Sequence, residues 1–155
     1  PILAKGLDNT LKAAAHAGVN GMLVVDLPID ESKEFFNGCK RYAIEPICLI
    51  SPSTSPDRVK KINAHSHSFL YYVCRNGTTG VKKTLPADYA ATLNTLKNYV
   101  TQPIVCGFGI SNRSLSQQAI QHAEGFVVGS AFINAITQGA TPDELKQLAI
   151  NLDPR

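Results

Sequence analysis

The sequence predicts an α/β fold with a parallel sheet, because three features of the chain agree. Five short apolar runs recur along the 155 residues, and segments of helical period separate them. The runs are continuous rather than alternating, which is typical of strands buried on both faces. Strands that alternate with helices are joined by right-handed crossovers. The length suits one domain over residues 1–155.

The five predicted strands are short and are bounded by glycine, proline or polar residues. They cover residues 21–28, 46–51, 68–74, 103–109 and 125–131. Because each is followed by a segment of helical period, the order is strand and helix repeated five times, behind one leading helix.

The first two predicted helices carry clear boundary signals. A helix over residues 6–18 stops at Gly18, and a helix over residues 30–43 begins with Asp30 as its expected N-cap. Phe35, Phe36 and Cys39 share one side of the second helix. That apolar side predicts a face packed against the sheet.

Four more helices and a short extra one follow. The helices are expected over residues 54–65, 85–100, 111–123 and 141–152, with a spare helical turn over 131–136. Ser-Pro-Asp and Thr-Pro-Asp starts suit the N-termini of the first and last of these.

Two architectures share this order of elements, an open doubly wound sheet and a (β/α)8 TIM barrel. The doubly wound fold predicts a G-x-G-x-x-G turn after an early strand, and the sequence has none. A barrel predicts functional groups at the carboxyl ends of its strands, and a phosphate site built by the last two strand–helix loops with a short extra helix. The sequence shows this second pattern, which favours the barrel.

The last two predicted strands end in similar glycine motifs, "GFGIS" and "VVGSA". Glycine allows close approach of a ligand and a positive φ, and a helix that starts directly afterwards aims unpaired N–H groups at the same point. One Gly-x-Gly turn is weak evidence, whereas two on successive strands are stronger. They predict an anion site at Gly109, Gly129 and Ser130.

The segment "CRNGTTGVKK" after the third strand is polar and glycine-rich. It is longer than a minimal connection needs to be, and mobile lids are often built this way. An ordinary surface loop is the alternative. If it is a lid, Thr79 and Gly80 close over the ligand, and Arg75 orients the ligand or anchors the loop.

Three further side chains on the predicted strands are candidates for the site, with Asp26 at the end of the first strand. Asp26 is a carboxylate that acts in the site, orders the next helix or contacts a partner. Tyr71 and Phe108 offer flat surfaces for an aromatic substrate, and a role in the core is an equal alternative for both.

Composition excludes several classes of function. The net charge is only +3, with 15 basic residues scattered among 12 acidic ones, which is unlike a nucleic-acid-binding surface. Apolar runs are too short for a membrane helix. Four cysteines without C-x-x-C spacing indicate buried thiols in a reducing cytoplasm, and the four histidines offer no metal site.

Five stretches together resemble a known family. "AGVNGMLVVDLPIDES", "ISPSTSPDRVKKI", "YYVCRNGTTG", "CGFGIS" and "GFVVGSAF" are similar, in order and spacing, to signatures of the tryptophan synthase alpha subunit family. The resemblance implies a TIM barrel that cleaves indole-3-glycerol phosphate to indole and glyceraldehyde 3-phosphate in the cytoplasm. It also implies an α2β2 complex with a beta subunit that carries the pyridoxal phosphate, and no cofactor on this chain.

The resemblance assigns roles residue by residue. It implies phosphate binding by Gly80, Gly109, Gly129 and Ser130; an indole pocket of Tyr71, Phe108 and Val127; a lid loop with Arg75, Gly77 and Thr79; and a rim facing the partner at Asp26 and Pro28. Two positions depart from the pattern: Cys74 replaces the usual serine, and Thr78 the common valine.

The family's catalytic glutamate and its aspartate partner would precede Pro1. The resemblance therefore implies an incomplete barrel of about five strand–helix units, a C-terminal part of the subunit, and no catalytic residue in this chain. Five strands cannot close an eight-stranded barrel, so two unpaired edges are expected.

Two alternatives stay open. A non-catalytic regulatory subunit would bind and activate the beta subunit without cleaving the substrate. Another phosphate-binding barrel, such as a ribulose-phosphate epimerase, would need a His and Asp metal pattern that the sequence lacks.

Overall fold

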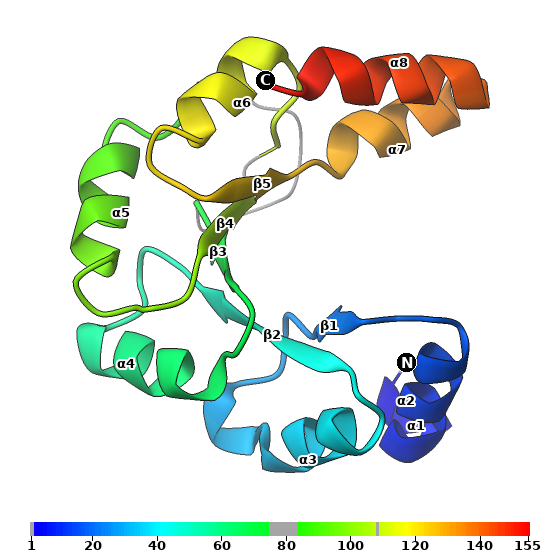
Figure 1. The fold of residues 1–155 in the computed structure, drawn as a ribbon, viewed down its shortest axis with the longest axis vertical. Coiled ribbons are helices and arrows are strands. Elements are labelled where there is room, and N and C mark those ends of the chain that lie inside the picture. Colours follow the sequence, from blue (N-terminus) through cyan, green and yellow to red (C-terminus); the bar gives the residue numbers. More distant parts are fainter. Residues whose placement is uncertain (1, 75–83, 108) are drawn as a thin grey trace.

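The computed structural model describes residues 2–74, 84–107 and 109–155, and its centre is a parallel sheet (Figure 1). The strands are β1 Gly21–Leu23, β2 Glu45–Ile50, β3 Leu70–Val73, β4 Ile104–Gly107 and β5 Gly125–Val127. They lie in chain order, and every neighbouring pair is parallel. The predicted α/β class and the five strand–helix units are confirmed.

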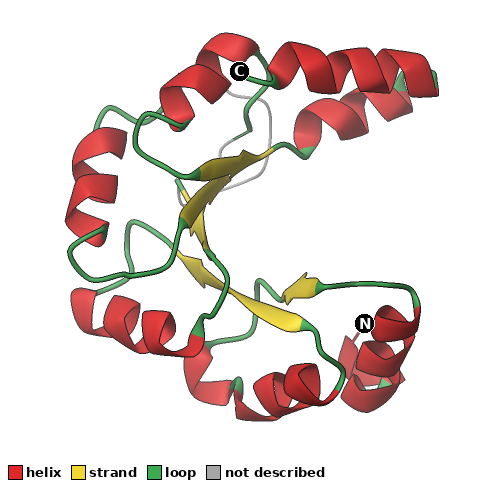
Figure 2. Cartoon of the chain, in the orientation of Figure 1, coloured by secondary structure: helices red, strands yellow, loops and turns green. Residues whose placement is uncertain are grey.

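Helices cover the outer side of the sheet (Figure 2). They are α1 Ile2–Lys5, α2 Leu7–His16, α3 Lys33–Arg41, α4 Pro56–His65, α5 Tyr89–Leu96, α6 Arg113–Ala119, α7 Ser130–Thr137 and α8 Pro142–Leu152, with a 3-10 turn η1 at Ile29–Glu31. The elements form an arc with β1 and β5 at the two edges of the sheet, so the concave side is open (Figure 1).

Every strand is shorter than the sequence predicts at its carboxyl end. Only Gly21 to Leu23 of the first predicted strand pair with β2, and the chain then turns away from the sheet. The last predicted strand is wrong beyond Val127, because Ser130 already begins α7. The strand ends that remain are loops, which is where ligand-binding groups of such folds are found.

The strands are not equally buried on both faces, contrary to the expectation from their continuous apolar runs. Burial alternates along β2, β3 and β4. The buried residues, among them Ile50, Tyr72 and Cys106, pack with residues of the outer helices in the main core. The alternate residues face the open concave side and are only half-buried, because no further strands of the described chain close over them.

Two helix starts show how local and distant contacts compete. Asp30 is not the N-cap that the sequence predicts: it lies in η1, and α3 begins after Ser32. Its carboxylate instead forms ion pairs with Arg58, at 3.3 Å, and with Lys61 of α4. The Thr141 cap of α8 is confirmed, since Thr141 and Glu144 form a reciprocal capping box.

Glu124 joins the amino ends of β4 and β5. Its carboxylate accepts hydrogen bonds from Lys97 Nζ at 2.7 Å and from the Ile104 N–H at 2.8 Å. Burial acts to raise the pKa of this carboxyl, but the hydrogen bonds outweigh it and hold the pKa below its ordinary value of 4.5. The folded chain therefore favours the ionised form more than the unfolded chain does.

Glu124 should make the stability of the protein depend on acid pH. Its contribution is fully present above the unfolded pKa and is lost as pH falls through the lower folded pKa. We expect the difference in unfolding free energy between the unaltered chain and Glu124→Gln to shrink from about pH 6 to about pH 3, measured by urea unfolding. A difference that stays constant over this range would contradict the prediction.

Candidate functional site

The concave face of the sheet carries two rows of side chains near the strand carboxyl ends. Register places Leu49 beside Tyr71, and Tyr71 beside Val105. One row further along, Val73 lies beside Gly107, and Gly107 beside Val127. Tyr71 and Val127, two residues expected in an aromatic pocket, therefore line the same face.

Leu49 and Val73 belong to this face although the sequence reasoning did not single them out. Leu49 lies opposite Tyr71 on the neighbouring strand, and Val73 lies two residues after Tyr71 on the same strand. Period-two alternation along β2 and β3 was the signal that could have found them. Both are half-buried, as a lining residue of an open face should be.

The Tyr71 phenol lies across Gly107 on the neighbouring strand. A Cβ atom added to Gly107 would lie 1.9 Å from Tyr71 Oη and 2.4 Å from its Cζ. The Tyr71 ring can therefore occupy this position only because residue 107 has no side chain. Burial raises the pKa of Tyr71 above its ordinary value of 10.0, which keeps the hydroxyl in the neutral form that a phenol already has near neutral pH.

Gly109 makes a turn that other residues rarely adopt. Its φ is 80°, in the left-handed region, and the next residue, Ile110, is fully buried. The helix α6 then begins after Asn112, whose side chain accepts a hydrogen bond from the Leu115 N–H at 3.0 Å. The sequence predicts a helix that starts at Ser111, whereas Asn112 is the cap and the helix begins at Arg113.

The start of α7 is different, because no described side chain caps it. Gly129 is the N-cap residue, and a Cβ added there would have open space around it. The first intrahelical bond recorded at this end runs from the Ile133 N–H to the Gly129 carbonyl at 3.1 Å. The N–H groups of Ser130 and the two residues after it precede that bond, so they are positioned to receive an anion.

The two glycine turns both lie at the carboxyl ends of their strands. Gly107 and Val127 lie opposite each other on the neighbouring strands β4 and β5. Gly109 comes two residues after Gly107, and Gly129 comes two residues after Val127. Strands β4 and β5 are neighbours, so the structure brings together the three residues of the predicted anion site.

Asp26 and Pro28 are separated from that anion site by the width of the sheet. Both are exposed, and both line a cavity of about 270 Å³ between the loop after β1 and helices α3 and α4. Asp26 forms no hydrogen bond or ion pair with another described residue, and Ser32 precedes the next helix. Of the roles considered for Asp26, ordering the start of α3 is therefore not observed.

Five predicted site residues lie outside the described residues. They are Arg75, Gly77, Thr79, Gly80 and Phe108. Their assignment to a lid, to the phosphate and to the aromatic pocket stays a prediction.

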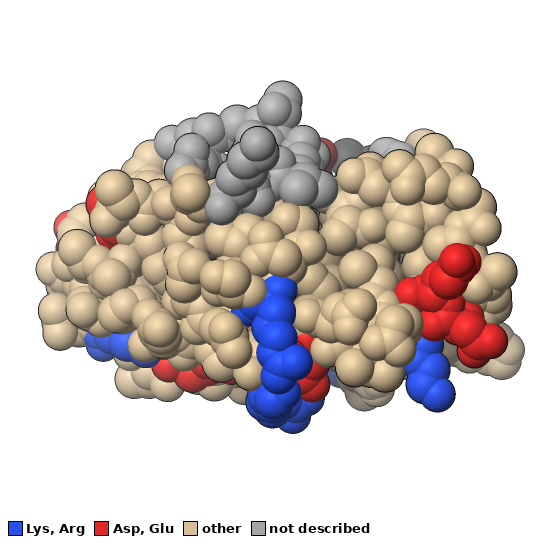
Figure 3. Space-filling model, turned by 90° about the horizontal axis from the view of Figure 1, so that it is seen from above, with Lys and Arg blue, Asp and Glu red and all other residues tan. Residues whose placement is uncertain are grey.

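The other side chains considered in the sequence are the cysteines and the possible metal ligands. All four cysteines are buried, and none of them forms a disulfide. Within residues 2–74, 84–107 and 109–155, no cluster of three or more His, Cys, Asp or Glu residues could hold a metal, and no helix is long and apolar enough to cross a membrane. On the face shown in Figure 3, acidic and basic groups lie beside one another rather than forming a patch of one sign.

Comparison with known proteins identifies the family. A family model described as the tryptophan synthase alpha chain matches residues 1–153. The chain belongs to the tryptophan synthase alpha chain family.

Two relatives with this name show how far the similarity extends. The tryptophan synthase alpha chain of Coxiella burnetii is 50% identical over 154 residues, which are 99% of this chain and 60% of that protein. The alpha chain of Chlamydia felis is 42% identical over 159 residues, covering 100% of this chain and 62% of its own. The chain thus spans about three-fifths of the length of these tryptophan synthase alpha chains.

Solved tryptophan synthase structures share the fold. A Mycobacterium tuberculosis tryptophan synthase superposes with a TM-score of 0.86 at 28% identity, over 98% of this chain and 57% of that one. A tryptophan synthase complex from Pyrococcus furiosus gives a TM-score of 0.80 at 29% identity, over 98% and 60%. The arc of five strands therefore corresponds to part of the alpha chain fold.

Proposed function

We propose that this chain forms the phosphate- and indole-binding part of a tryptophan synthase alpha subunit. In that role it holds indole-3-glycerol phosphate, a substrate that is cleaved to indole and glyceraldehyde 3-phosphate in tryptophan biosynthesis. The observation that carries the proposal is the pairing of the Gly109 turn with the uncapped start of α7 on adjacent strands. Membership of the family supports the identity of the substrate.

The phosphate would bind at the carboxyl ends of β4 and β5. N–H groups at the start of α7 offer donors without a cationic side chain, and the positive end of the helix dipole adds favourable electrostatics. The Ser130 hydroxyl adds a side-chain donor at the first position of the helix. Gly80 would approach from the loop after β3.

The indole ring would rest on the concave face beside the phosphate. Tyr71 and Val127 line this face, and Phe108 is the third residue of the proposed pocket. Aromatic and aliphatic walls suit a flat bicyclic ring, since such a ring gains most from apolar contact. The loop bearing Arg75, Gly77 and Thr79 would close over the bound molecule.

Cleavage needs more than these binding groups. The carbon–carbon bond breaks when C3 of the indole gains a proton and a glycerol hydroxyl loses one, giving neutral indole and an aldehyde. A positioned acid or base typically contributes about 10²–10⁴-fold in rate. The resemblance assigns these roles to a glutamate and an aspartate outside the 155 residues, so we propose that these residues alone bind without efficient cleavage.

The partner would be a beta subunit. One solved relative from Pyrococcus furiosus is described as a tryptophan synthase α2β2 complex. Asp26 and Pro28, exposed at the strand carboxyl ends, would lie on the rim that faces this partner. The proposal needs no cofactor on this chain, because the pyridoxal phosphate belongs to the beta subunit.

The test measures binding and cleavage side by side. We expect the 155-residue chain to bind inorganic phosphate and indole in calorimetric titrations, and to release indole from indole-3-glycerol phosphate at least about 10²-fold more slowly than an alpha chain with both carboxylates. Equal turnover would overturn the division between binding and catalysis.

A second measurement separates the regulatory alternative. Beta-subunit activity is followed while this chain is added, with and without the substrate. Activation without any binding of phosphate or indole would favour a purely regulatory subunit, whereas ligand binding favours the proposal.

A further inference from the structure

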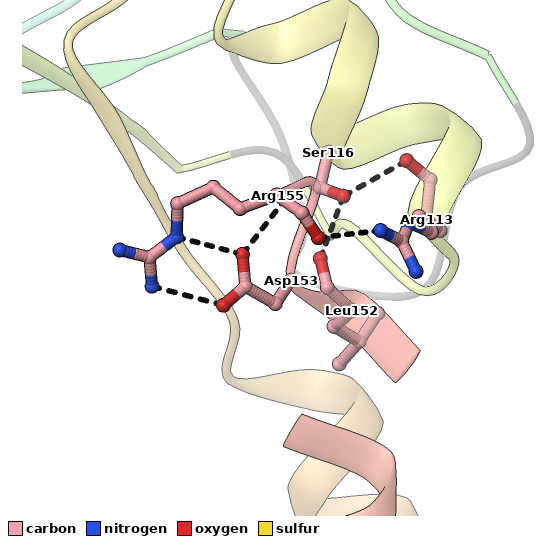
Figure 4. Close-up of polar contacts among 5 residues, drawn as sticks. All are labelled: Arg113, Ser116, Leu152, Asp153 and Arg155. Carbon is pink, nitrogen blue, oxygen red and sulfur yellow. Dashed lines mark hydrogen bonds and ion pairs between the residues drawn. The ribbon is translucent and has the colours of Figure 1, made fainter. Parts of the chain in front are cut away.

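The C-terminal end of α8 is tied to α6, the helix that follows the Gly109 turn (Figure 4). The Ser116 hydroxyl lies 2.7 Å from the Leu152 carbonyl oxygen and 2.9 Å from the Arg113 carbonyl oxygen. Ser116 is 0% exposed. A hydroxyl has one proton to donate, and the shorter distance leads to Leu152 on the other helix. A buried hydrogen bond of this kind holds two helices at a set separation.

A second contact reaches α6 from the same segment. Arg113 Nη2 donates to the Arg155 carbonyl oxygen. The Arg155 guanidinium in turn donates to both carboxylate oxygens of Asp153, each at 2.9 Å (Figure 4). Such a two-pronged contact fixes orientation as well as distance. We call residues 152–155, which hold α6 through Ser116 and Arg113, the C-terminal clasp.

The clasp links the two segments that would hold the phosphate. Helix α8 packs against α7 as well as α6. The anion-facing N–H groups lie at the start of α7, and Gly109 lies four residues before α6 begins. A ligand bound by N–H groups from both segments needs each within about 3 Å of its oxygens at the same time. Their relative position therefore decides affinity.

We propose that Ser116 is a positioning residue for the phosphate site: through the C-terminal clasp it holds α6, and with it the Gly109 turn, in register with the start of α7. This inference rests on the proposed function. Ser116 lies one helical turn beyond Asn112, and its N–H bonds to the Asn112 carbonyl at 3.2 Å, so a shift of Ser116 is passed to the capped start of α6. Ser116 itself does not touch the ligand.

Ser116→Ala tests this role, with Ser66→Ala as its matched control. Ser66 is also buried, at 1% exposed, and its hydroxyl also donates to a backbone carbonyl, that of Phe69 at 3.2 Å. Ser66 lies before the amino end of β3, whereas the proposed phosphate site lies at the carboxyl ends of β4 and β5. Both variants of the 155-residue chain are titrated with inorganic phosphate and glycerol 3-phosphate, and thermal unfolding is recorded for each.

We expect Ser116→Ala to raise the phosphate Kd about fivefold, because the N–H donors of the two segments lose part of their alignment, while Ser66→Ala stays within about twofold of the unaltered chain. NMR signals of the Gly109 and Ser130 amides should shift in Ser116→Ala but not in Ser66→Ala. Both variants should lose comparable thermal stability. If Ser116 only stabilised the fold, the two variants would therefore not differ in their phosphate Kd.

Asp153→Asn provides a second variant in case Ser116→Ala does not fold. It releases the Arg155 side chain from the clasp and also removes a negative charge. Losing that charge would by itself strengthen the binding of a phosphate anion. We nevertheless expect Asp153→Asn to bind phosphate about twofold more weakly, which would show that the changed position of α6 outweighs the change in charge.

The outcomes are distinguishable. If the unaltered chain does not bind phosphate, both the proposed site and the positioning role are overturned. If it binds phosphate and the Ser116 and Asp153 variants bind equally well, only the positioning role is overturned.

Discussion

Gly107→Ala is expected to destabilise the protein by about 1–3 kcal/mol, because the new methyl group overlaps the position of the Tyr71 ring and forces it to move. Its Cβ would lie 1.9 Å from Tyr71 Oη, far inside van der Waals contact. The ring can avoid the overlap only by moving over the concave face, where the proposed indole pocket lies. Indole binding should weaken together with stability.

A double-mutant cycle checks the cause. In a Tyr71→Ala background the overlap is gone, so Gly107→Ala should cost little, and the coupling energy measured by urea unfolding should be about 1–3 kcal/mol. Gly125→Ala is the matched control on the next strand, since its Cβ would meet Val105 at an ordinary 3.4 Å. Equal costs of Gly107→Ala in both backgrounds would show that Tyr71 does not impose the glycine.

Ile110→Ala is expected to cost about 2–5 kcal/mol of unfolding free energy and to weaken phosphate binding as well. Ile110 is 0% exposed, and it follows Gly109 directly, so its side chain anchors the turn to the main core. Removing most of that side chain leaves a cavity under the turn. The N–H groups of the proposed site then lose their fixed position.

Leu93→Ala is the matched control for this variant. Leu93 is also 0% exposed in the same core, but it lies on α5, away from the glycine turns. Both variants should unfold at similarly lower urea concentrations, while only Ile110→Ala raises the phosphate Kd, by about tenfold or more. A similar Kd for both would mean that the turn keeps its geometry without its anchor.

Much of the scaffold could be predicted because it depends on neighbours in the chain. Apolar runs separated by amphipathic segments reveal strands and helices through their periods, and the Thr141 capping box acts within three residues. The glycine turns could also be predicted, since the positive φ of Gly109 is a local property. Parallel order then follows from the crossovers.

Some site residues could not be found from local patterns. Asn112 rather than Ser111 caps α6 through a contact three residues away, and asparagine and serine are about equally good caps, so local preference does not choose between them. Asp30 pairs instead with Arg58 and Lys61 of α4, which are contacts that only the folded chain makes. Period-two alternation places Leu49 and Val73 on one face of their strands, but only the register between strands shows that Tyr71 and Val127 line the same face.

The sequence by itself determined the α/β class, the five strand–helix units, the two glycine-ended strands and the family resemblance. Periodicity and backbone freedom act over a few residues, so they can be read along the chain. Tertiary structure decided that Tyr71 lies across Gly107, that Ser116 bonds to Leu152, and that the start of α7 has no described side-chain cap. The first two contacts join residues 36 positions apart in the chain, and only packing and strand register bring such residues together.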